Sequence, residues 1–127
     1  MEKFRNVIHH YLQINHEILC GDITVDELIE HRWKIMTETG YHNDYKILID
    51  VRKATFVNFL NDIPWLMEYA KKASKYFNLN RKCAFITSSP EHVAYAELLK
   101  SHLVEMENHY IINVFSTESA ALNWLLK

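Results

Sequence analysis

The sequence of 127 residues contains little glycine, with only Gly21 and Gly40. Glycine-rich phosphate loops and dinucleotide-binding fingerprints need several glycines at fixed spacing, so both are excluded. Cysteine is equally scarce, and Cys20 and Cys83 lie too far apart to form a paired-cysteine metal motif. We therefore expect two buried, reduced thiols in a cytoplasmic protein.

Long apolar runs and an excess of charge of one sign are also absent. No stretch approaches the roughly 20 apolar residues that cross a bilayer, and residues 1–6 lack the apolar core of a signal peptide. The formal net charge of −2 argues against binding nucleic acid through a general positive field. With 49% hydrophobic and 24% charged residues, the composition is that of a globular protein, and we expect one domain over residues 1–127.

The segment 45–51 is the stretch around which the chain is organised. Its odd-numbered residues are all apolar, whereas Lys46, Leu48 and Asp50 form a mixed face. This alternation, with turn-like residues at 40–44, predicts a buried strand. The polar residues on one face favour helices gathered mostly on the other side of the sheet.

The residues before this strand predict a hairpin. Loose alternation indicates strands over 4–9 and 13–20, and the turn between them falls at either His9-His10 or Asn15-His16. The pattern is broken at Gly21-Asp22, which we interpret as the end of the second strand.

A helix follows the hairpin directly. Thr24 and Glu27 have the spacing of a capping box, in which each side chain bonds the backbone amide of the other residue. Apolar residues at helical spacing continue to about Thr39, and Gly40 is the expected stop.

A second helix is predicted after the central strand. Residues 52–61 are harder to assign: residues 55–60 form either a loop or a first helical turn. Asp62 with Pro64 close behind is a typical helix start. The inward residues of this helix are expected to be Ile63, Leu66, Met67, Ala70, Ala73 and Phe77.

Two further strand–helix pairs complete the chain, with strands over 82–87 and 109–115. Ser89 with Pro90 predicts the start of the helix after the first of these strands, and residues 116–118 cap the last helix. The expected inward residues are Val93, Ala96, Leu99, Leu103 and Met106 in one helix and Ala121, Trp124 and Leu125 in the other. Strands alternating with helices predict an α/β fold with a mostly parallel sheet, an antiparallel N-terminal strand and four helices.

Residues 21–28 (GDITVDEL), 47–52 (ILIDVR) and 114–125 (VFSTESAALNWL) together resemble the SpoIIAA-like family of small bacterial proteins related to the STAS domain. The resemblance spans nearly the whole chain and implies a βα superhelical fold with a regulatory or binding role. True anti-sigma antagonists carry an Asp-Ser-Ser/Thr-Gly motif with a phosphorylated serine after the central strand. The matching residues 55–61 contain neither the motif nor a glycine.

The sequence offers little chemistry for catalysis or metal binding. It has no Gly-x-Ser-x-Gly elbow and no His-Glu-x-x-His motif. Among eight histidines, His9 and His10 point to opposite strand faces, and His92 and His102 are not at a metal-ligand spacing. Asp50 beside Arg52 is interpreted as a structural acceptor rather than an acid or base. We expect no catalytic residues, no metal and no cofactor.

Three functions remain open, and the third is an enzyme whose active site no sequence motif marks. The first is a non-catalytic regulatory or protein-interaction module that binds an unidentified protein partner and forms a homodimer. The aromatic residues Phe56, Phe59 and Trp65 belong either to its core or to an exposed contact patch. The alternative is a domain that binds a small anionic or lipid-like ligand at the carboxyl ends of the strands. The candidate binding residues there are Arg52, Ser88, Ser89 and Ser116.

An apolar pocket of several hundred cubic ångström with a few convergent polar groups would favour the ligand. A flat, exposed apolar patch would favour the protein partner. The serines at the strand ends have a plainer interpretation as helix caps alone.

Overall fold

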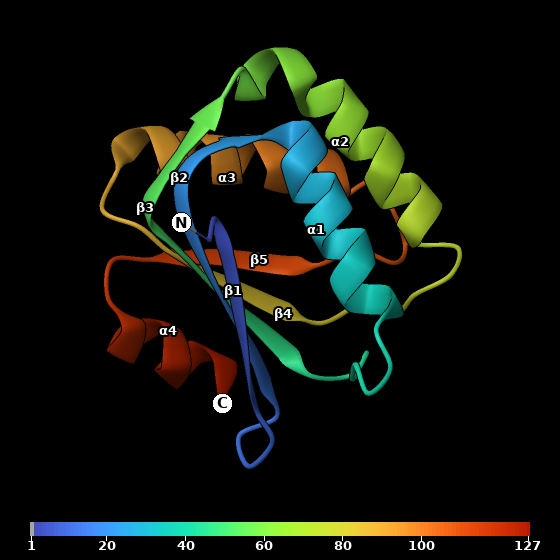
Figure 1. Cartoon of the computed structure of the whole chain (residues 1–127), viewed down its shortest axis with the longest axis vertical. Coiled ribbons are helices and arrows are strands. Elements are labelled where there is room, and N and C mark those ends of the chain that lie inside the picture. Colours follow the sequence, from blue (N-terminus) through green and yellow to red (C-terminus); the bar gives the residue numbers. More distant parts are fainter. Residues whose placement is uncertain (1) are drawn as a thin grey trace.

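The computed structural model describes residues 2–127 and contains one five-stranded sheet with the order β1-β2-β3-β4-β5 (Figure 1). The strands are β1 (Phe4–His9), β2 (Ile14–Thr24), β3 (Lys46–Val57), β4 (Lys82–Ile86) and β5 (Ile111–Phe115). β1 is antiparallel to β2, and the other neighbouring strands are parallel. The predicted α/β class, with its antiparallel N-terminal strand, is confirmed.

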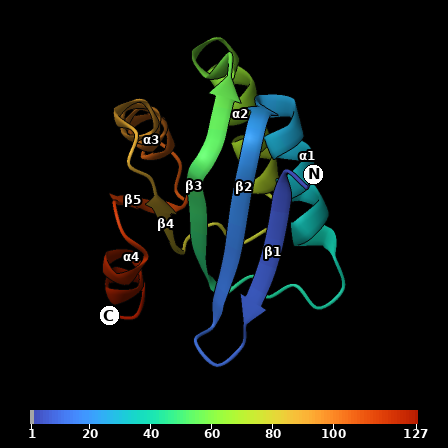
Figure 2. The same cartoon turned by 60° about the vertical axis from the view of Figure 1, so that its left-hand side comes forward.

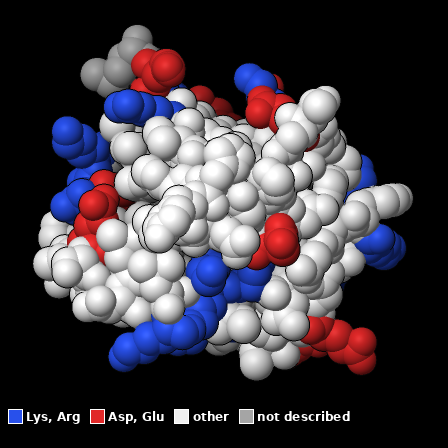
Figure 3. Space-filling model, turned by 90° about the horizontal axis from the view of Figure 1, so that it is seen from below, with Lys and Arg blue, Asp and Glu red and all other residues white. Residues whose placement is uncertain are grey.

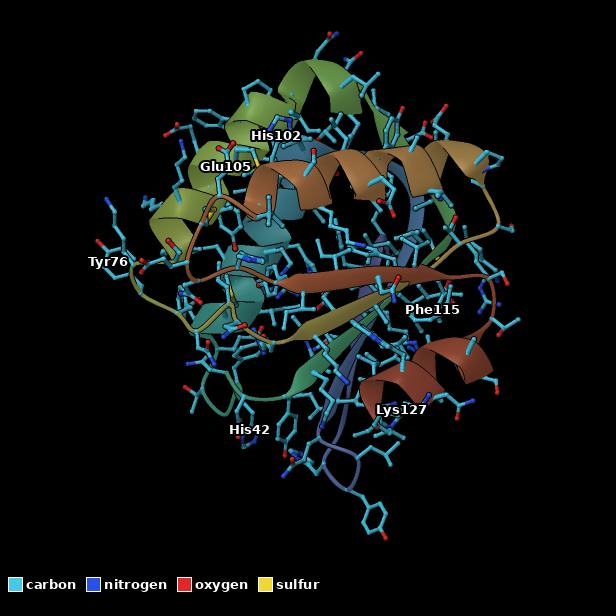
Figure 4. All side chains as sticks on the ribbon, turned by 180° about the vertical axis from the view of Figure 1, so that it is seen from behind. His42, Tyr76, His102, Glu105, Phe115 and Lys127 are labelled. Carbon is cyan, nitrogen blue, oxygen red and sulfur yellow. The ribbon has the colours of Figure 1, made fainter. Side chains whose placement is uncertain are left out.

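Four helices cover the sheet unequally. They are α1 (Val25–Thr37), α2 (Phe59–Ala73), α3 (Pro90–Leu103) and α4 (Glu118–Leu125). Side chains from α1, α2 and α3 share a core on one face of the sheet, whereas α4 packs on the opposite face. Figure 4 shows α3 and α4 on either side of β5. The expectation that most helices gather on one side is confirmed.

The alternation along β3 explains this division. Ile47, Ile49 and Val51 belong to the core beneath α1, α2 and α3. Leu48 points the other way and packs in the smaller cluster with Ala121 of α4. Because side chains of a strand alternate between faces, one strand serves two separate cores.

The predicted helix starts are formed as expected. The Thr24 hydroxyl accepts a hydrogen bond from the Glu27 amide at 3.1 Å, and the Glu27 carboxylate accepts one from the Thr24 amide at 3.0 Å. At α3, the Ser89 hydroxyl accepts from the amide of His92, and Pro90 is the first helical residue. These caps satisfy amides that the helix itself leaves without a partner.

Two strands are longer than the sequence indicated. β2 continues through Gly21, whose φ is 80°, to Thr24, and β3 continues to Val57. Residues 52–57 therefore form strand rather than a loop or helical turn. The cause is tertiary, because the ends of β2 and β3 pair with each other as a two-stranded ribbon beyond the end of β4 (Figure 2).

The start of α2 also differs from the prediction. The helix begins at Phe59 instead of Asp62, and Pro64 lies inside it. Asn58 makes the change of direction, with a left-handed φ of 55°. Asparagine adopts this conformation more readily than most residues, which allows a strand to pass into a helix within one residue.

Smaller corrections concern the hairpin, the short strands and α3. The hairpin turn comprises residues 10–13, directly after His9, whereas Asn15-His16 lies within β2. β4 ends at residue 86 and β5 begins at residue 111, so both are shorter than expected. In α3, Val93 is 39% exposed, and His92 takes the buried place beside it.

The last helix is anchored by two residues. Ala121 and Leu125 have no exposed surface. Trp124, expected to be buried, is only half-buried, with its ring centroid 5.7 Å from that of Phe115. The cap of α4 is the hydroxyl of Thr117, which accepts from the amide of Ala120.

Two further features concern the charges on one face of the molecule and the length of the helices. Figure 3 shows acidic and basic side chains interspersed over the face seen from below, as a net charge of −2 suggests. None of the helices within residues 2–127 combines the length and the apolar character needed to cross a membrane.

Candidate ligand-binding cavity

A cavity of about 100 Å³ lies between the sheet and the three helices α1, α2 and α3. Its walls are mostly apolar and are formed by Leu19, Leu28, Ile47, Ile49, Phe56, Leu66, Ala70, Cys83, Phe85, Leu99, Leu103 and Ile112. Four polar side chains complete the lining, namely Glu17, Arg32, Tyr69 and Tyr110. The site is therefore an apolar chamber with a few polar groups.

A second cavity of about 60 Å³ adjoins the first. The two share five lining residues, which are Leu28, Phe56, Leu66, Phe85 and Leu99. Protein interiors are packed as densely as organic crystals, and few voids exceed the size of a water molecule. A somewhat larger cavity of about 150 Å³, lined by apolar side chains alone, binds benzene in another protein. The pair of cavities thus offers room for a compact hydrocarbon group.

The polar group nearest the sheet is a buried carboxylate. Glu17 on β2 forms an ion pair with Arg32 of α1. It is also 3.1 Å from the ring nitrogen Nε2 of His31 and accepts a hydrogen bond from the Asn15 amide group at 3.1 Å. Burial alone would raise the pKa of Glu17, but the charge of Arg32 and the hydrogen bonds outweigh it and lower the pKa from 4.5 to about 2. Glu17 is therefore ionised inside the protein.

Arg32 links this carboxylate to the far side of the cavity. Its second guanidinium nitrogen donates to the hydroxyl of Tyr110 at 3.1 Å. The Tyr110 hydroxyl in turn lies 3.8 Å from the sulfur of Met36. A chain of polar contacts thus runs from β2 through α1 to the start of β5.

Tyr69 is the one tyrosine of the cavity lining whose hydroxyl has no hydrogen-bond partner within residues 2–127, although the oxygen is buried. Burial raises the pKa of Tyr69, so the phenol stays protonated and remains a donor. A buried donor without an acceptor is unfavourable and unusual in a native protein. A group that occupies the cavity and carries an acceptor would satisfy this hydroxyl.

A second buried cation lies close to the same end of the core. Arg81, directly before β4, is 5% exposed. It donates to the backbone oxygens of His42 and Tyr45 and to the hydroxyl of Tyr41. Its Nε has no acceptor, and no carboxylate pairs with it, within residues 2–127. Buried groups in this region therefore comprise two arginines and a single carboxylate, Glu17.

The far end of the second cavity carries a neutral polar pair. The Thr87 hydroxyl and the His92 ring nitrogen Nδ1 are 2.7 Å apart. Burial lowers the pKa of His92, which favours its uncharged form. The Thr87 oxygen also accepts from the Ser89 amide, so this pair ties the end of β4 to α3.

The binding residues predicted from the sequence lie outside the cavity. Arg52 is held by Asp50, with contacts of 3.0 Å from Nε and 2.7 Å from Nη2. Asp50 is thus a structural acceptor, as expected. Ser89 caps α3, whereas Ser88 and Ser116 are exposed. The cap of α4 is the next residue, so the interpretation of Ser116 as that cap is wrong.

The sheet register places these residues at one edge. Residue 50 of β3 pairs with residue 86 of β4, which pairs with residue 115 of β5, so the segments that follow leave the sheet side by side. A ligand site at this edge stays a prediction. Within residues 2–127, no group of three or more His, Cys, Asp or Glu side chains is arranged to hold a metal ion.

The sequence analysis did not identify the polar end of the cavity, although the positions of Glu17 and Arg32 in the sequence indicated it. Asn15, Glu17 and Leu19 share one face of the predicted strand 13–20, and that face contains a carboxylate. Arg32 lies in the apolar stripe of the next helix. Charges of opposite sign at inward positions of consecutive elements indicate a buried ion pair.

Comparison with known proteins supports the fold and does not identify an activity. No protein-family model matches the chain, and no curated protein matches it either. The structure is similar to the crystal structure of an uncharacterised protein of the DUF3478 family with a SpoIIAA-like fold from Shewanella loihica PV-4. The TM-score is 0.63 at 15% sequence identity, over 98% of this chain and 95% of the other. The chain therefore has a SpoIIAA-like fold.

Proposed function

We propose that this chain is a non-catalytic binding domain whose internal cavity holds a small, mostly apolar molecule. The observation that carries the proposal is the mostly apolar chamber between the sheet and α1–α3, with its polar groups gathered on a few residues. The alternative expected from the sequence was an anionic or lipid-like ligand at the strand ends, so this proposal differs in the place of the site and in the apolar character of the ligand. The cavity is also smaller than the several hundred cubic ångström that the sequence analysis named as favouring a ligand. The expected cytoplasmic location stays a prediction.

The chemistry of the lining supports a non-catalytic role. Cys83 is the nucleophilic side chain of the cavity wall, and burial raises its pKa to about 12. Thiols react as thiolates, so this cysteine is an inert part of the wall at neutral pH. Glu17 is fully engaged by Arg32, His31 and Asn15, which leaves it poorly placed to accept a proton from a ligand.

The volume sets the size of the ligand. An engineered apolar cavity of about 150 Å³ binds benzene in another protein, so a chamber of about 100 Å³ by itself suits about four carbon atoms. Small movements of the side chains shared with the second cavity would extend this space by a few more atoms. A ring or a short chain fits, whereas a long acyl chain does not.

We expect toluene to bind the unaltered protein and Ala70→Leu to abolish that binding. Ala70 lines the cavity, and the added carbon atoms of leucine would fill part of it. Binding is measured by the methyl shifts of Leu28, Leu66 and Leu99 during an NMR titration. The same variant should gain stability, because it fills a void.

Lys71→Leu is the matched control, since it adds leucine at the next, exposed position of α2. Toluene should bind this variant as it binds the unaltered protein. The proposal is wrong if toluene produces no saturable shift in the unaltered protein, or if Ala70→Leu binds it undiminished while remaining folded.

A second candidate function is suggested by the groove between α1 and α2. This groove of about 510 Å³ is lined by Ile29, Glu30, Trp33, Trp65, Glu68, Tyr69 and Lys72. Trp65 is 60% exposed, whereas Phe59 is buried, so the aromatic run divides between surface and core. Exposed tryptophan in a groove is typical of contact surfaces, which supports the protein-interaction module and homodimer expected from the sequence.

If the groove joins two copies, light scattering at high micromolar concentration should give a dimer mass, and Trp65→Ser should reduce it to that of a monomer. Removing a large aromatic anchor from a contact surface commonly weakens binding by 2 kcal/mol or more, about thirtyfold. Tyr11→Ser, at an exposed aromatic residue of the hairpin turn outside the groove lining, is the control. A monomer mass for the unaltered chain would rule out the homodimer.

A further inference from the structure

The polar end of the cavity has chemistry that selects among small apolar ligands. Three observations describe it: a buried hydroxyl without an acceptor, a buried arginine in the cavity lining, and an excess of buried positive charge. The first two concern the lining residues Tyr69 and Arg32, whereas the surplus cation is Arg81, which does not line the cavity and lies near the ring of Tyr110.

Tyr69 supplies a hydrogen-bond donor. Its buried oxygen has no partner within the described part of the chain, and its ring forms part of the cavity wall. The hydroxyl is protonated at neutral pH because it is desolvated. A ligand that places an acceptor beside this hydroxyl would satisfy a group that the protein leaves unsatisfied.

Arg32 supplies further donors beside it. A guanidinium carries five N–H groups, and two of those on Arg32 find acceptors within residues 2–127, on Glu17 and on Tyr110. Both terminal nitrogens are engaged, one by Glu17 and one by Tyr110, so Arg32 offers an acidic group its positive charge and the second hydrogen of each nitrogen rather than a vacant fork.

The charge balance favours an anion over a neutral acceptor. Arg32 and Arg81 are both buried, and Glu17 is the single buried carboxylate in residues 2–127. Both arginines lie near the ring of Tyr110, each with its guanidinium carbon 5.8 Å from the ring centre. A surplus cation in a poorly hydrated interior attracts a counter-ion and repels a second cation.

Tyr69 borders a second space that is open to solvent. It lines the outer groove between α1 and α2 as well as the cavity. Its ring centroid is 6.4 Å from that of Trp33 in the groove wall. A ligand that enters apolar end first would leave its head group beside Tyr69.

Resting on the proposed function, we infer that the cavity is selective for small organic acids, whose carboxylate is bound by Tyr69 and Arg32 while the hydrocarbon part fills the chamber. The specificity-determining group is the Tyr69 hydroxyl. Arg32 stabilises the fold through its ion pair with Glu17, so altering it would change stability as well as ligand binding. Tyr69 has no such partner and is therefore the better position for a substitution that tests binding alone.

The test compares hexanoate, 1-hexanol and hexylamine, which share one chain and differ in the head group. NMR titration at pH 7.5 should show hexanoate binding at least about tenfold more tightly than hexanol, since hydrogen bonds to charged groups are the stronger ones. Hexylamine should not bind. Toluene reports on the chamber without using the polar end.

Tyr69→Phe removes one oxygen and leaves the ring in place. It should weaken hexanoate binding about tenfold, leave toluene binding unchanged and keep the melting temperature equal or higher, because the hydroxyl has no partner to lose. Tyr76→Phe, at an exposed tyrosine, is the matched control and should change nothing.

The failures of the two proposals are distinguishable. Toluene binding with equal affinities for hexanoate and hexanol overturns the selectivity and leaves the chamber intact as a binding site. An unchanged hexanoate affinity in Tyr69→Phe overturns the role of that hydroxyl. If toluene does not bind the unaltered protein, the proposed function itself is wrong.

Discussion

Glu17→Gln should lower the free energy of unfolding at pH 7 by about 3–5 kcal/mol, measured in urea. The variant keeps the size of the side chain and removes the charge that balances Arg32. Breaking a buried ion pair at one partner leaves the other charge desolvated and uncompensated, which is among the costliest single changes. Glu30→Gln on the exposed side of α1 is the control and should change stability by less than about 0.5 kcal/mol.

The pH dependence of unfolding tests the same ion pair without altering the arginine. The pKa of Glu17 is about 2 in the folded chain against 4.5 as the reference value. Its stabilising effect is therefore complete above about pH 4.5 and is lost as the pH falls from there toward 2. The unaltered protein should lose about 3 kcal/mol over this range through Glu17, and Glu17→Gln should lack that contribution.

A double variant tests whether the loss of stability in Glu17→Gln comes from the unpaired charge of Arg32. Glu17→Met with Arg32→Met removes both charges and retains volume, so it should be more stable than Glu17→Gln alone. If Glu17→Gln is as stable as the unaltered protein, the pair is solvated in solution and the account of the polar end is wrong.

Leu125→Ala should lower the free energy of unfolding by about 3 kcal/mol, within the 2–5 kcal/mol that such truncations cost in a core. Leu125 is fully buried and packs with Leu48, Ala84 and Ile86 beneath α4. The substitution leaves a void in a small core that has few other apolar residues to close it. Urea unfolding followed by circular dichroism gives the change.

Leu126→Ala is the matched control for this helix. Leu126 is 48% exposed and adjoins Leu125 in sequence, so its truncation should cost less than about 1 kcal/mol. Similar losses in the two variants would show that α4 is loosely attached. Toluene should still bind Leu125→Ala, because α4 and the cavity lie on opposite faces of the sheet.

The sequence predicted the strands and helices correctly wherever the local pattern of residues agrees with their burial in the structure. The alternation of Ile47, Ile49 and Val51 predicted the central strand and the side that the helices cover. The capping residues Thr24 and Ser89 predicted two helix starts to the residue. In these places periodicity and hydrogen-bonding chemistry act within a few residues, so one window of sequence holds the information.

Local sequence was insufficient where the structure depends on distant pairing. Residues 52–57 carry charges and no strong alternation, yet they form strand because residues 20–24 lie beside them. The polar end of the candidate site was not predicted from the sequence for the same reason. Glu17 and Arg32 are fifteen positions apart, and Tyr69 and Tyr110 join them only when α2 and β5 have packed.

The mixed face of β3 has a consequence for how reliably the sheet assembles. If β3 paired with its neighbours one position out of step, its side chains would exchange sides. Lys46 and Asp50 would then enter the core beneath α1, α2 and α3, which in the native arrangement receives only apolar side chains from this part of the strand. Burying two unpaired charges costs several kcal/mol each. These two polar residues therefore act against slippage and misfolding, and help to restrict the chain to a single pairing.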